Sequence, residues 1–315
     1  MSLERALELA EKGRGTTHPN PVVGAVVVRD GAVVGEGWHE RKGGPHAEVN
    51  ALSAAGESAR GATLFVSLEP CRAFGETGPC TEAVLEARVA RVVAGSLDPS
   101  PDAGGGLEEL RNAGVEVELA DGEVGFRARA QNEGWRTWVR EQRPFVIYKA
   151  AVTLDGRMAV PGRRWVSGEA SRRLVHELRA QVDAVAVGMG TVRSDAPQLT
   201  ARGVGAARQP RRLAFGRRPL PTGSDLELRT GGLAHELGAL AQEGVQTLLL
   251  EGGPTLATAF LAADLVDKLL VFVAPVVAGT GPALVAALPS PRQLSRLSAT
   301  PVGEDVLLTA YVHEP

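Results

Sequence analysis

Cysteine and aromatic residues are scarce in this chain: two of its 315 residues are cysteine, and 4% are Phe, Trp or Tyr. Two cysteines are too few for a disulfide-stapled secreted domain, which favours a reducing cytoplasm. The sequence lacks an apolar run of about 18 residues, the length that a membrane-spanning helix needs. The net charge is only −3, and no basic segment is interleaved with aromatic residues, so we expect neither a nucleic-acid nor a membrane partner.

The length and the apolar content are typical of two α/β domains. A chain of 315 residues with 44% hydrophobic content can form two cores. Residues 2–7 are predicted to form an amphipathic helix and not a signal peptide. Strands that alternate with helices predict an α/β layer fold with ligands at the strand ends. The predicted strands are 22–28, 33–38, 63–67, 92–96, 115–119, 145–152, 184–187 and 247–250, and the predicted helices are 47–55, 81–90, 107–113, 126–142, 172–181 and 255–263.

A candidate catalytic zinc site is the strongest motif. His46 offers an imidazole, Cys71 and Cys80 offer thiolates, and Glu48 lies two residues after His46. Zinc-dependent nucleobase deaminases use one His and two Cys as ligands, with a Glu that moves protons without touching the metal. Three protein ligands leave the fourth position to water, whose pKa the metal lowers to about 7, making hydroxide available at neutral pH. An inert histidine with two buried cysteines is the plainer interpretation, but each cysteine follows a proline at a loop-to-helix junction.

The second half lacks the Gly-x-Gly-x-x-Gly fingerprint of an ordinary Rossmann domain. Gly188-Met189-Gly190 follows a predicted strand without the third glycine. The better candidate anion site is Glu251-Gly252-Gly253, which lies between a predicted strand and a predicted helix. Glycines allow close backbone approach, and free N–H groups at a helix start favour phosphate. A Gly-Gly turn is about as often purely structural.

Two sets of short motifs follow one another along the chain. The first set is Pro19–Gly24, Gly35–His39, Pro45–Val49 and Leu68–Cys71. The second set is Lys149–Gly156, Trp165–Gly168, Leu178-Arg179, Gly190–Val192, Asp195–Arg202 and Glu251–Gly253. The first set resembles the deaminase half, and the second set the reductase half, of the bifunctional riboflavin-biosynthesis family RibD. The resemblance covers nearly the whole chain, and the two sets together are more specific than either alone.

The resemblance implies a cytidine-deaminase-like three-layer domain at residues 1–143 and a dihydrofolate-reductase-like domain at residues 144–315. It implies one Zn²⁺ held by His46, Cys71 and Cys80, with Glu48 as the catalytic proton carrier, and NADPH as the second cofactor. The implied NADPH-binding residues are Ala151, Trp165, Thr191, Asp195, Gly252 and Gly253. The implied substrate-binding residues are Asn20, His39, Arg163, Arg179, Leu199, Arg202 and Glu251. Arginines match phosphate oxygens well; for Arg179 the alternative is a solvated helix face.

The implied function is a two-step enzyme. Zinc hydroxide would deaminate 2,5-diamino-6-(5-phosphoribosylamino)pyrimidin-4-one, and NADPH would then reduce the ribose of 5-amino-6-(5-phosphoribosylamino)uracil to ribitol. The partner is thus a phosphorylated ribosylaminopyrimidine, and homo-oligomerisation stays open. Two alternatives remain: an active reductase with an impaired deaminase half, or a deaminase of another nucleobase.

Two segments depart from the family pattern. Ala73 and Glu76 replace a usual His and a usual Arg or Lys, and Glu76 is expected to repel a phosphorylated substrate, for which Arg72 offers a nearby cation. The segment Arg212–Leu240 is shorter than usual, where the adenosine end of NADPH is expected to bind.

Overall fold

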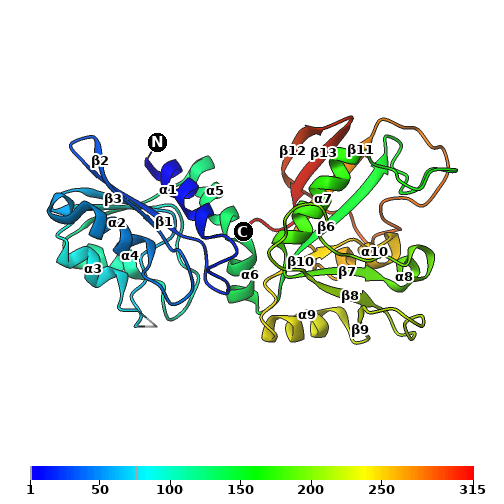
Figure 1. Cartoon of the computed structure of the whole chain (residues 1–315), viewed down its shortest axis with the longest axis horizontal. Coiled ribbons are helices and arrows are strands. Elements are labelled where there is room, and N and C mark those ends of the chain that lie inside the picture. The colour runs from blue at the N-terminus through cyan, green and yellow to red at the C-terminus, as the bar shows by residue number, and fades with distance from the viewer. Residues whose placement is uncertain (1, 75–76) are drawn as a thin grey trace. The chain divides into compact units, whose positions relative to one another are not determined.

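The computed structural model describes residues 2–74 and 77–315 and divides into two compact units, Met1–Arg140 with Pro315, and Glu141–Glu314. Each unit is built around one β-sheet flanked by helices (Figure 1). No helix among the described residues combines the length and the apolar character needed to cross a membrane.

The first unit contains a five-stranded sheet in the order β2-β1-β3-β4-β5. β1 pairs antiparallel with both β2 and β3, whereas β3, β4 and β5 run parallel. The strands are β1 (Gly24–Arg29), β2 (Ala32–Trp38), β3 (Thr63–Val66), β4 (Arg91–Ala94) and β5 (Glu116–Leu119). The helices are α1 (Ser2–Ala10), α2 (Ala47–Ala55), α3 (Cys80–Glu86), α4 (Gly106–Asn112), α5 (Gly122–Gln131) and α6 (Glu133–Glu141).

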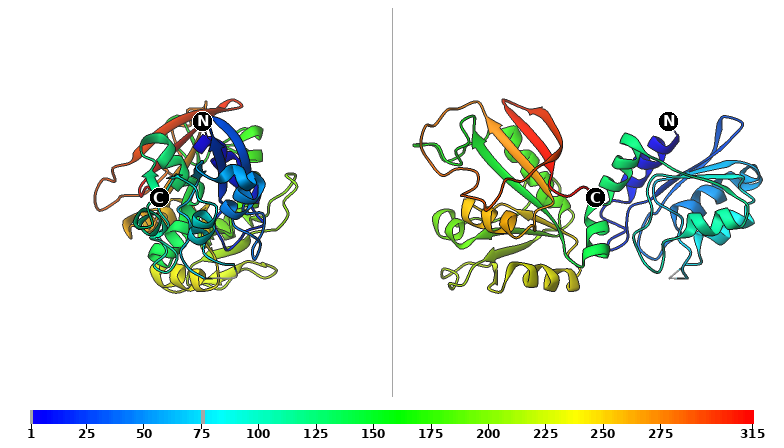
Figure 2. Two further views of the ribbon diagram at one scale, coloured as in Figure 1. Left: turned by 90° about the vertical axis from the view of Figure 1, so that its left-hand side faces the viewer. Right: turned by 180° about the vertical axis from the view of Figure 1, so that it is seen from behind.

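Glycines let helices pack directly on both faces of this sheet. A Cβ at Gly24 would overlap the backbone of α1, and a Cβ at Gly37 would overlap the backbone of α2. Gly24 pairs with Trp38, the neighbour of Gly37, so the two glycines face opposite sides of the pleat. The helices α1 and α2 therefore cover opposite faces, which gives three layers, seen from behind in Figure 2.

The predicted helix over residues 126–142 is wrong as a single element, because Asn132 separates α5 from α6. The Asn132 side-chain amide accepts a hydrogen bond from Val22 N and donates one to Val22 O, both at 2.9 Å. This pairing holds the Asn132 backbone outside helical geometry, at φ −119° and ψ 28°. The predicted helix over 81–90 is also too long: α3 ends at Glu86, and Arg88 has a left-handed φ of 56°. The predicted bounds of α2 are confirmed.

The second unit contains an eight-stranded sheet in the order β12-β13-β11-β6-β10-β7-β8-β9. The strands from β11 to β9 run parallel, and β13 and β12 extend the sheet antiparallel. The strands are β6 (Phe145–Thr153), β7 (Ala184–Gly188), β8 (Arg211–Phe215), β9 (Glu227–Arg229), β10 (Thr247–Leu250), β11 (Lys268–Ala274), β12 (Ser295–Val302) and β13 (Asp305–Tyr311). The helices are α7 (Glu169–Gln181), α8 (Met189–Asp195), α9 (Leu233–Gln242) and α10 (Pro254–Ala262).

The parallel strands β6, β10 and β7 bring their carboxyl ends to one edge of the sheet, which is where open α/β sheets bind ligands. The helix α7 is fixed beside this sheet by Asp305, whose carboxylate accepts hydrogen bonds from Gly168 N at 2.8 Å and Ser171 Oγ at 2.5 Å. Asp305 is 2% exposed and thus acts as a buried cap of the amino end of α7.

Candidate functional site

Three potential metal ligands converge in the first unit. The nitrogen or sulfur donors of His46, Cys71 and Cys80 all lie within 4.8 Å of one another. His46 Nδ1 is 3.1 Å from Cys80 Sγ and 3.5 Å from Cys71 Sγ. Zinc bonds of about 2.0–2.3 Å in a tetrahedron separate such donors by comparable distances. The donor set and its spacing therefore fit one Zn²⁺ with a fourth position for water.

Two helix starts and one strand end produce this convergence. His46 is the extended residue that precedes α2, and Cys80 is the first residue of α3. Cys71 follows β3 in the loop that leads to α3. Because α2 and α3 start close together, residues from separate parts of the sequence reach one point.

The carboxyl group of Glu48 is buried beside the three donors. Glu48 is 3% exposed, in the first turn of α2. Burial raises the pKa of Glu48 to about 7, and the charges of His46 and Cys71 act on it in opposite directions. A carboxyl group that gains and loses its proton near neutral pH suits general acid–base chemistry.

The cysteine thiols are held in a shared hydrogen-bonded arrangement. The hydrogen bond from Cys80, with a further one from His46, lowers the pKa of Cys71, whereas the same hydrogen bond and burial raise the pKa of Cys80, so the pair holds one thiolate on Cys71. A lowered pKa favours the thiolate, which is the form that binds zinc.

Asn20 and His39 lie next to the potential zinc ligands. Asn20 Nδ2 is 3.4 Å from His39 Nε2, and His39 Nδ1 is 3.1 Å from Pro45 O. The rings of His39 and His46 are 5.3 Å apart at an angle of 78°. Burial lowers the pKa of His39, which favours the neutral ring. The structure thus brings both predicted substrate-binding residues of this half together beside the donor cluster.

The loop between Cys71 and Cys80 holds the departures from the family pattern. Thr77, which the sequence analysis did not single out, has its hydroxyl 3.5 Å from His46 Nε2. Arg72 is exposed, and its guanidinium lies over Gly105. Ala73 is half-buried, and Glu76 lies outside the described residues.

A buried charge cluster surrounds Glu251, the residue that follows the carboxyl end of β10. Arg179 Nε and Nη2 donate to the Glu251 carboxylate at 2.6 and 3.0 Å, and Lys149 Nζ lies 3.4 Å from it. The side chains of Glu251 and Arg179 are 9% and 13% exposed. Burial alone would raise the pKa of Glu251, but Lys149 and Arg179 outweigh burial and lower the pKa below its usual value. The solvated-face interpretation of Arg179 is therefore wrong.

The turn after β10 can accept a phosphate-bearing cofactor. Gly253 precedes α10, with φ −68° and ψ 177°; Pro254 at the first position has no N–H, and the next N–H groups of the helix, those of Thr255 and Leu256, stay free of intrahelical partners. A Cβ at Gly252 would lie 3.0 Å from the Leu256 side chain, and a Cβ at Gly253 would lie 3.7 Å from Thr191 Oγ1. The structure thus brings Thr191 to the glycine turn, and the glycines keep the backbone accessible, which fits a dinucleotide phosphate.

The segment containing Leu199 and Arg202 is attached to α7. Thr200 O lies 3.0 Å from His176 Nδ1 and accepts a hydrogen bond from Arg179 Nη1 at 3.2 Å. Leu199 is buried, whereas Arg202 is exposed and donates to Gln198 and Thr200.

Four further residues that the sequence analysis assigned to the reductase site form none of the hydrogen bonds of the Glu251 cluster described above. Ala151 lies on β6, in register with Phe272 of β11. Arg163, Trp165 and Asp195 are exposed, and Trp165 packs against the guanidinium groups of neighbouring arginines. The structure therefore places these three at the surface and not in the Glu251 cluster.

The sequence analysis did not assign roles to Lys149 and His176. Lys149 precedes Ala151 by two residues, so both side chains lie on the same face of β6. A lysine inside the otherwise apolar strand Phe145–Val152 was the available signal.

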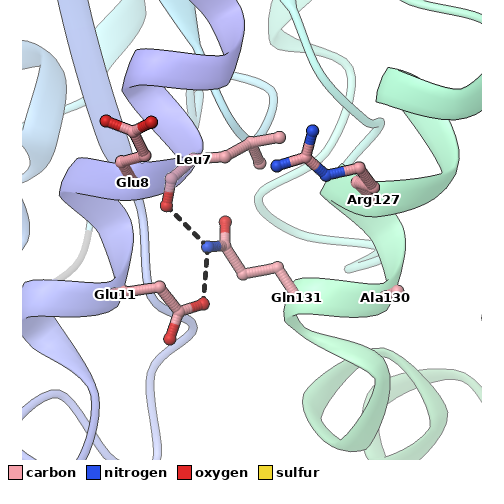
Figure 3. Close-up of a pocket in the computed structure, with 6 residues that line it drawn as sticks. All are labelled: Leu7, Glu8, Glu11, Arg127, Ala130 and Gln131. Carbon is pink, nitrogen blue, oxygen red and sulfur yellow. Dashed lines mark hydrogen bonds between the residues drawn. The ribbon is translucent and has the colours of Figure 1, made fainter. Parts of the chain in front are cut away.

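A hollow of about 280 Å³ also lies between α1 and α5 (Figure 3). Gln131 Nε2 crosses it and donates to Leu7 O at 2.8 Å and Glu11 Oε1 at 2.7 Å. Val124 of α5 packs with α1 against the sheet face opposite to α2. The hollow is therefore separate from the zinc-ligand cluster.

Two family models match the chain. One describes the cytidine and deoxycytidylate deaminase zinc-binding region and matches residues 2–96. The other describes the RibD C-terminal domain and matches residues 144–308. These matches confirm the predicted fold class of two α/β domains, the first of the cytidine-deaminase type, and they confirm zinc as a cofactor of the first.

Curated relatives and solved structures match almost the whole chain. The riboflavin biosynthesis protein RibD of Aquifex aeolicus is 40% identical, in a match that covers 89% of this chain and 87% of the relative. The protein of the same name from Escherichia coli is 37% identical, in a match that covers 93% of this chain and 92% of the relative. The solved structure of Acinetobacter baumannii RibD is similar, with a TM-score of 0.84, 35% identity, and 98% and 97% coverage.

A second similar structure carries a more explicit name. The Thermotoga maritima protein named a diaminohydroxyphosphoribosylaminopyrimidine deaminase/5-amino-6-(5-phosphoribosylamino)uracil reductase has a TM-score of 0.83 and 33% identity. The match covers 98% of this chain and 97% of that protein.

Proposed function

Because the chain belongs to the RibD family of bifunctional riboflavin-biosynthesis deaminases and reductases, which use zinc and NADPH, we propose its substrates and the residues that act on them. The first substrate is 2,5-diamino-6-(5-phosphoribosylamino)pyrimidin-4-one. The second is 5-amino-6-(5-phosphoribosylamino)uracil, which becomes 5-amino-6-(5-phosphoribitylamino)uracil. The name of the Thermotoga maritima relative supports both substrates. The observation that carries the proposal is the buried Glu48 beside three converging zinc donors.

In the deaminase site, His46, Cys71 and Cys80 would hold the metal, which would supply an activated water molecule with a pKa of about 7. Glu48 would accept a proton from the attacking water, whose oxygen replaces the amino group on the ring carbon. The same carboxyl group then gives a proton to the departing nitrogen, so that ammonia leaves and a carbonyl remains. The buried position of Glu48 beside the three donors, in the first turn of α2, allows it both roles. Asn20 and His39 bind the pyrimidine beside this group.

In the reductase site, NADPH supplies hydride to C1 of the ribose. The turn at Gly252-Gly253, with Thr191, holds a phosphate of the cofactor, and Ala151, Trp165 and Asp195 complete its site. Arg179 and Glu251 bind the polar substrate through a paired, preorganised cluster. Arg163, Leu199 and Arg202 flank the substrate, and the exposed arginines contact its phosphate.

Residues 1–143 are assigned to the deaminase and residues 144–315 to the reductase. The formal reaction classes are a zinc aminohydrolase and an NADPH-dependent oxidoreductase. A reducing compartment such as the cytoplasm keeps Cys71 and Cys80 available as thiolates for zinc.

The proposed function predicts two products that depend on NADPH. The purified, zinc-loaded chain is incubated with the diaminopyrimidine substrate, with and without NADPH, and products are identified by mass spectrometry. Without NADPH we expect ammonia and the deaminated ribosyl compound; with NADPH we expect the ribityl compound.

Each other outcome points to a different function. The second candidate is an active reductase with an impaired deaminase half, which the replacements Ala73 and Glu76 suggest. Reduction of the supplied deaminated intermediate, without release of ammonia from the diaminopyrimidine, would favour it. Deamination of other nucleobases, with the diaminopyrimidine left intact, would contradict the proposed substrate.

A further inference from the structure

The buried carboxylate of Glu69, two residues before Cys71 in the sequence, accepts hydrogen bonds from both ends of one loop. Glu69 is 4% exposed; its Oε2 accepts a hydrogen bond from Asp98 N at 3.0 Å, and its Oε1 accepts one from Leu107 N at 2.9 Å. These two N–H groups lie near the two ends of residues 97–107, which we term the clasp loop. From the other side, Arg136 Nη1 donates to Leu97 O at 2.7 Å. One side chain thus sets the width of the clasp loop at its base.

The clasp loop contacts the residue before Cys71 and the residue after it. Ahead of Cys71, a Cβ at Gly106 would overlap the Pro70 carbonyl oxygen, so the two backbones are in direct contact. Behind Cys71, Arg72 N donates to Ala103 O at 3.1 Å. The Cys71 carbonyl itself accepts a hydrogen bond from Thr81 N at 3.2 Å, next to Cys80. The backbone that carries the Cys71 sulfur is therefore held at each neighbouring residue.

We propose that Glu69 is a positioning residue of the deaminase, which sets the place of the Cys71 sulfur, and thereby metal affinity and geometry, through the clasp loop. Glu69 acts only through this loop and not as a ligand. The inference rests on the proposed zinc role of His46, Cys71 and Cys80. Groups that orient metal ligands without touching the metal are typically worth about 10–100-fold in metal affinity or activity.

Each oxygen of the Glu69 carboxylate accepts one hydrogen bond, so the substitution Glu69→Gln tests the role without changing the size of the side chain. A carboxylate can accept from both Asp98 N and Leu107 N, whereas an amide has one oxygen and presents an NH₂ group to the other donor. Glu69→Gln keeps size and shape but leaves one buried N–H without an acceptor. The base of the clasp loop then opens on one side.

The experiment measures cobalt(II) binding by zinc-depleted protein. Dissociation constants come from competition with a chromophoric chelator, and visible absorption bands report the coordination geometry. We expect Glu69→Gln to raise the dissociation constant about tenfold and to shift the absorption bands. Gly106→Ala, which pushes the clasp loop away from Pro70 while Glu69 stays intact, is expected to do the same, and it carries the test if Glu69→Gln does not fold.

Asn132→Ala is the matched control, because it removes two buried hydrogen bonds in the same unit without touching the clasp loop. It is expected to lower the melting temperature and to bind cobalt(II) like the wild type. Wild-type affinity and spectra in a folded Glu69→Gln or Gly106→Ala protein would overturn the inference. Equal weakening by Asn132→Ala would also overturn it, by showing a general stability effect. A wild-type protein that binds no metal would instead contradict the proposed function.

Discussion

Glu48→Gln is expected to lower the rate of deamination about 10³-fold while one zinc per chain stays bound. The amide cannot accept the proton of the zinc-activated water, and general acid–base groups contribute about 10²–10⁴-fold to such rates. The side chain is not one of the three converging donors, so zinc content should not change. Ammonia release under single-turnover conditions measures the loss, and elemental analysis measures the zinc.

Glu57→Gln provides the control, since Glu57 is an exposed carboxylate in the same unit. It should leave both quantities unchanged, and reduction of supplied intermediate should persist in both variants. Loss of zinc in Glu48→Gln would identify Glu48 as a ligand and refute its role as proton carrier.

Glu251→Gln is expected to reduce kcat/KM of the reductase step about a hundredfold and leave deamination intact. The substitution removes the charge that holds Arg179 and Lys149 in place, and small misplacements of positioning groups can cost about 10²-fold. Arg202→Ala should give a smaller loss, concentrated in KM, because Arg202 is an exposed residue outside the buried ion pairs. The measurement is NADPH oxidation with the deaminated intermediate as substrate.

Glu177→Gln is the matched control, because it removes an exposed ion pair on α7 with Arg173. It should behave like the wild type. Unchanged kcat/KM in a folded Glu251→Gln protein would separate this ion-pair cluster from the reductase site.

The zinc cluster could be predicted from the sequence because its chemistry is concentrated in short motifs. His46 and Glu48 share the first residues around one helix start, and the two cysteines flank one short loop. The helix α2 was also predictable, since a local apolar pattern fixes it. The break at Asn132 was not, because it depends on a hydrogen-bonding partner, Val22, that is 110 residues away in the sequence.

The reductase site shows the same limit. The local sequence of α7 is compatible with a solvated Arg179, and only the folded structure shows that Glu251, after β10, forms an ion pair with it. Lys149 lies on β6, 102 residues before Glu251, and no local pattern links the two. The clasp loop is likewise invisible in the sequence, because Glu69 binds the backbone of Asp98 and Leu107 and not their side chains.

The central claim is that two independent sites perform the two reactions. Zinc-depleted wild-type protein, confirmed as folded by circular dichroism because a metal site can contribute to folding, is supplied with the deaminated intermediate and NADPH. We predict that it reduces the intermediate at the rate of the zinc-loaded protein, that it releases no ammonia from the diaminopyrimidine, and that added Zn²⁺ restores deamination; Cys80→Ser should behave like the depleted protein without such recovery. Loss of intermediate reduction in folded, zinc-free protein would contradict the claim and show that the two reactions share a site.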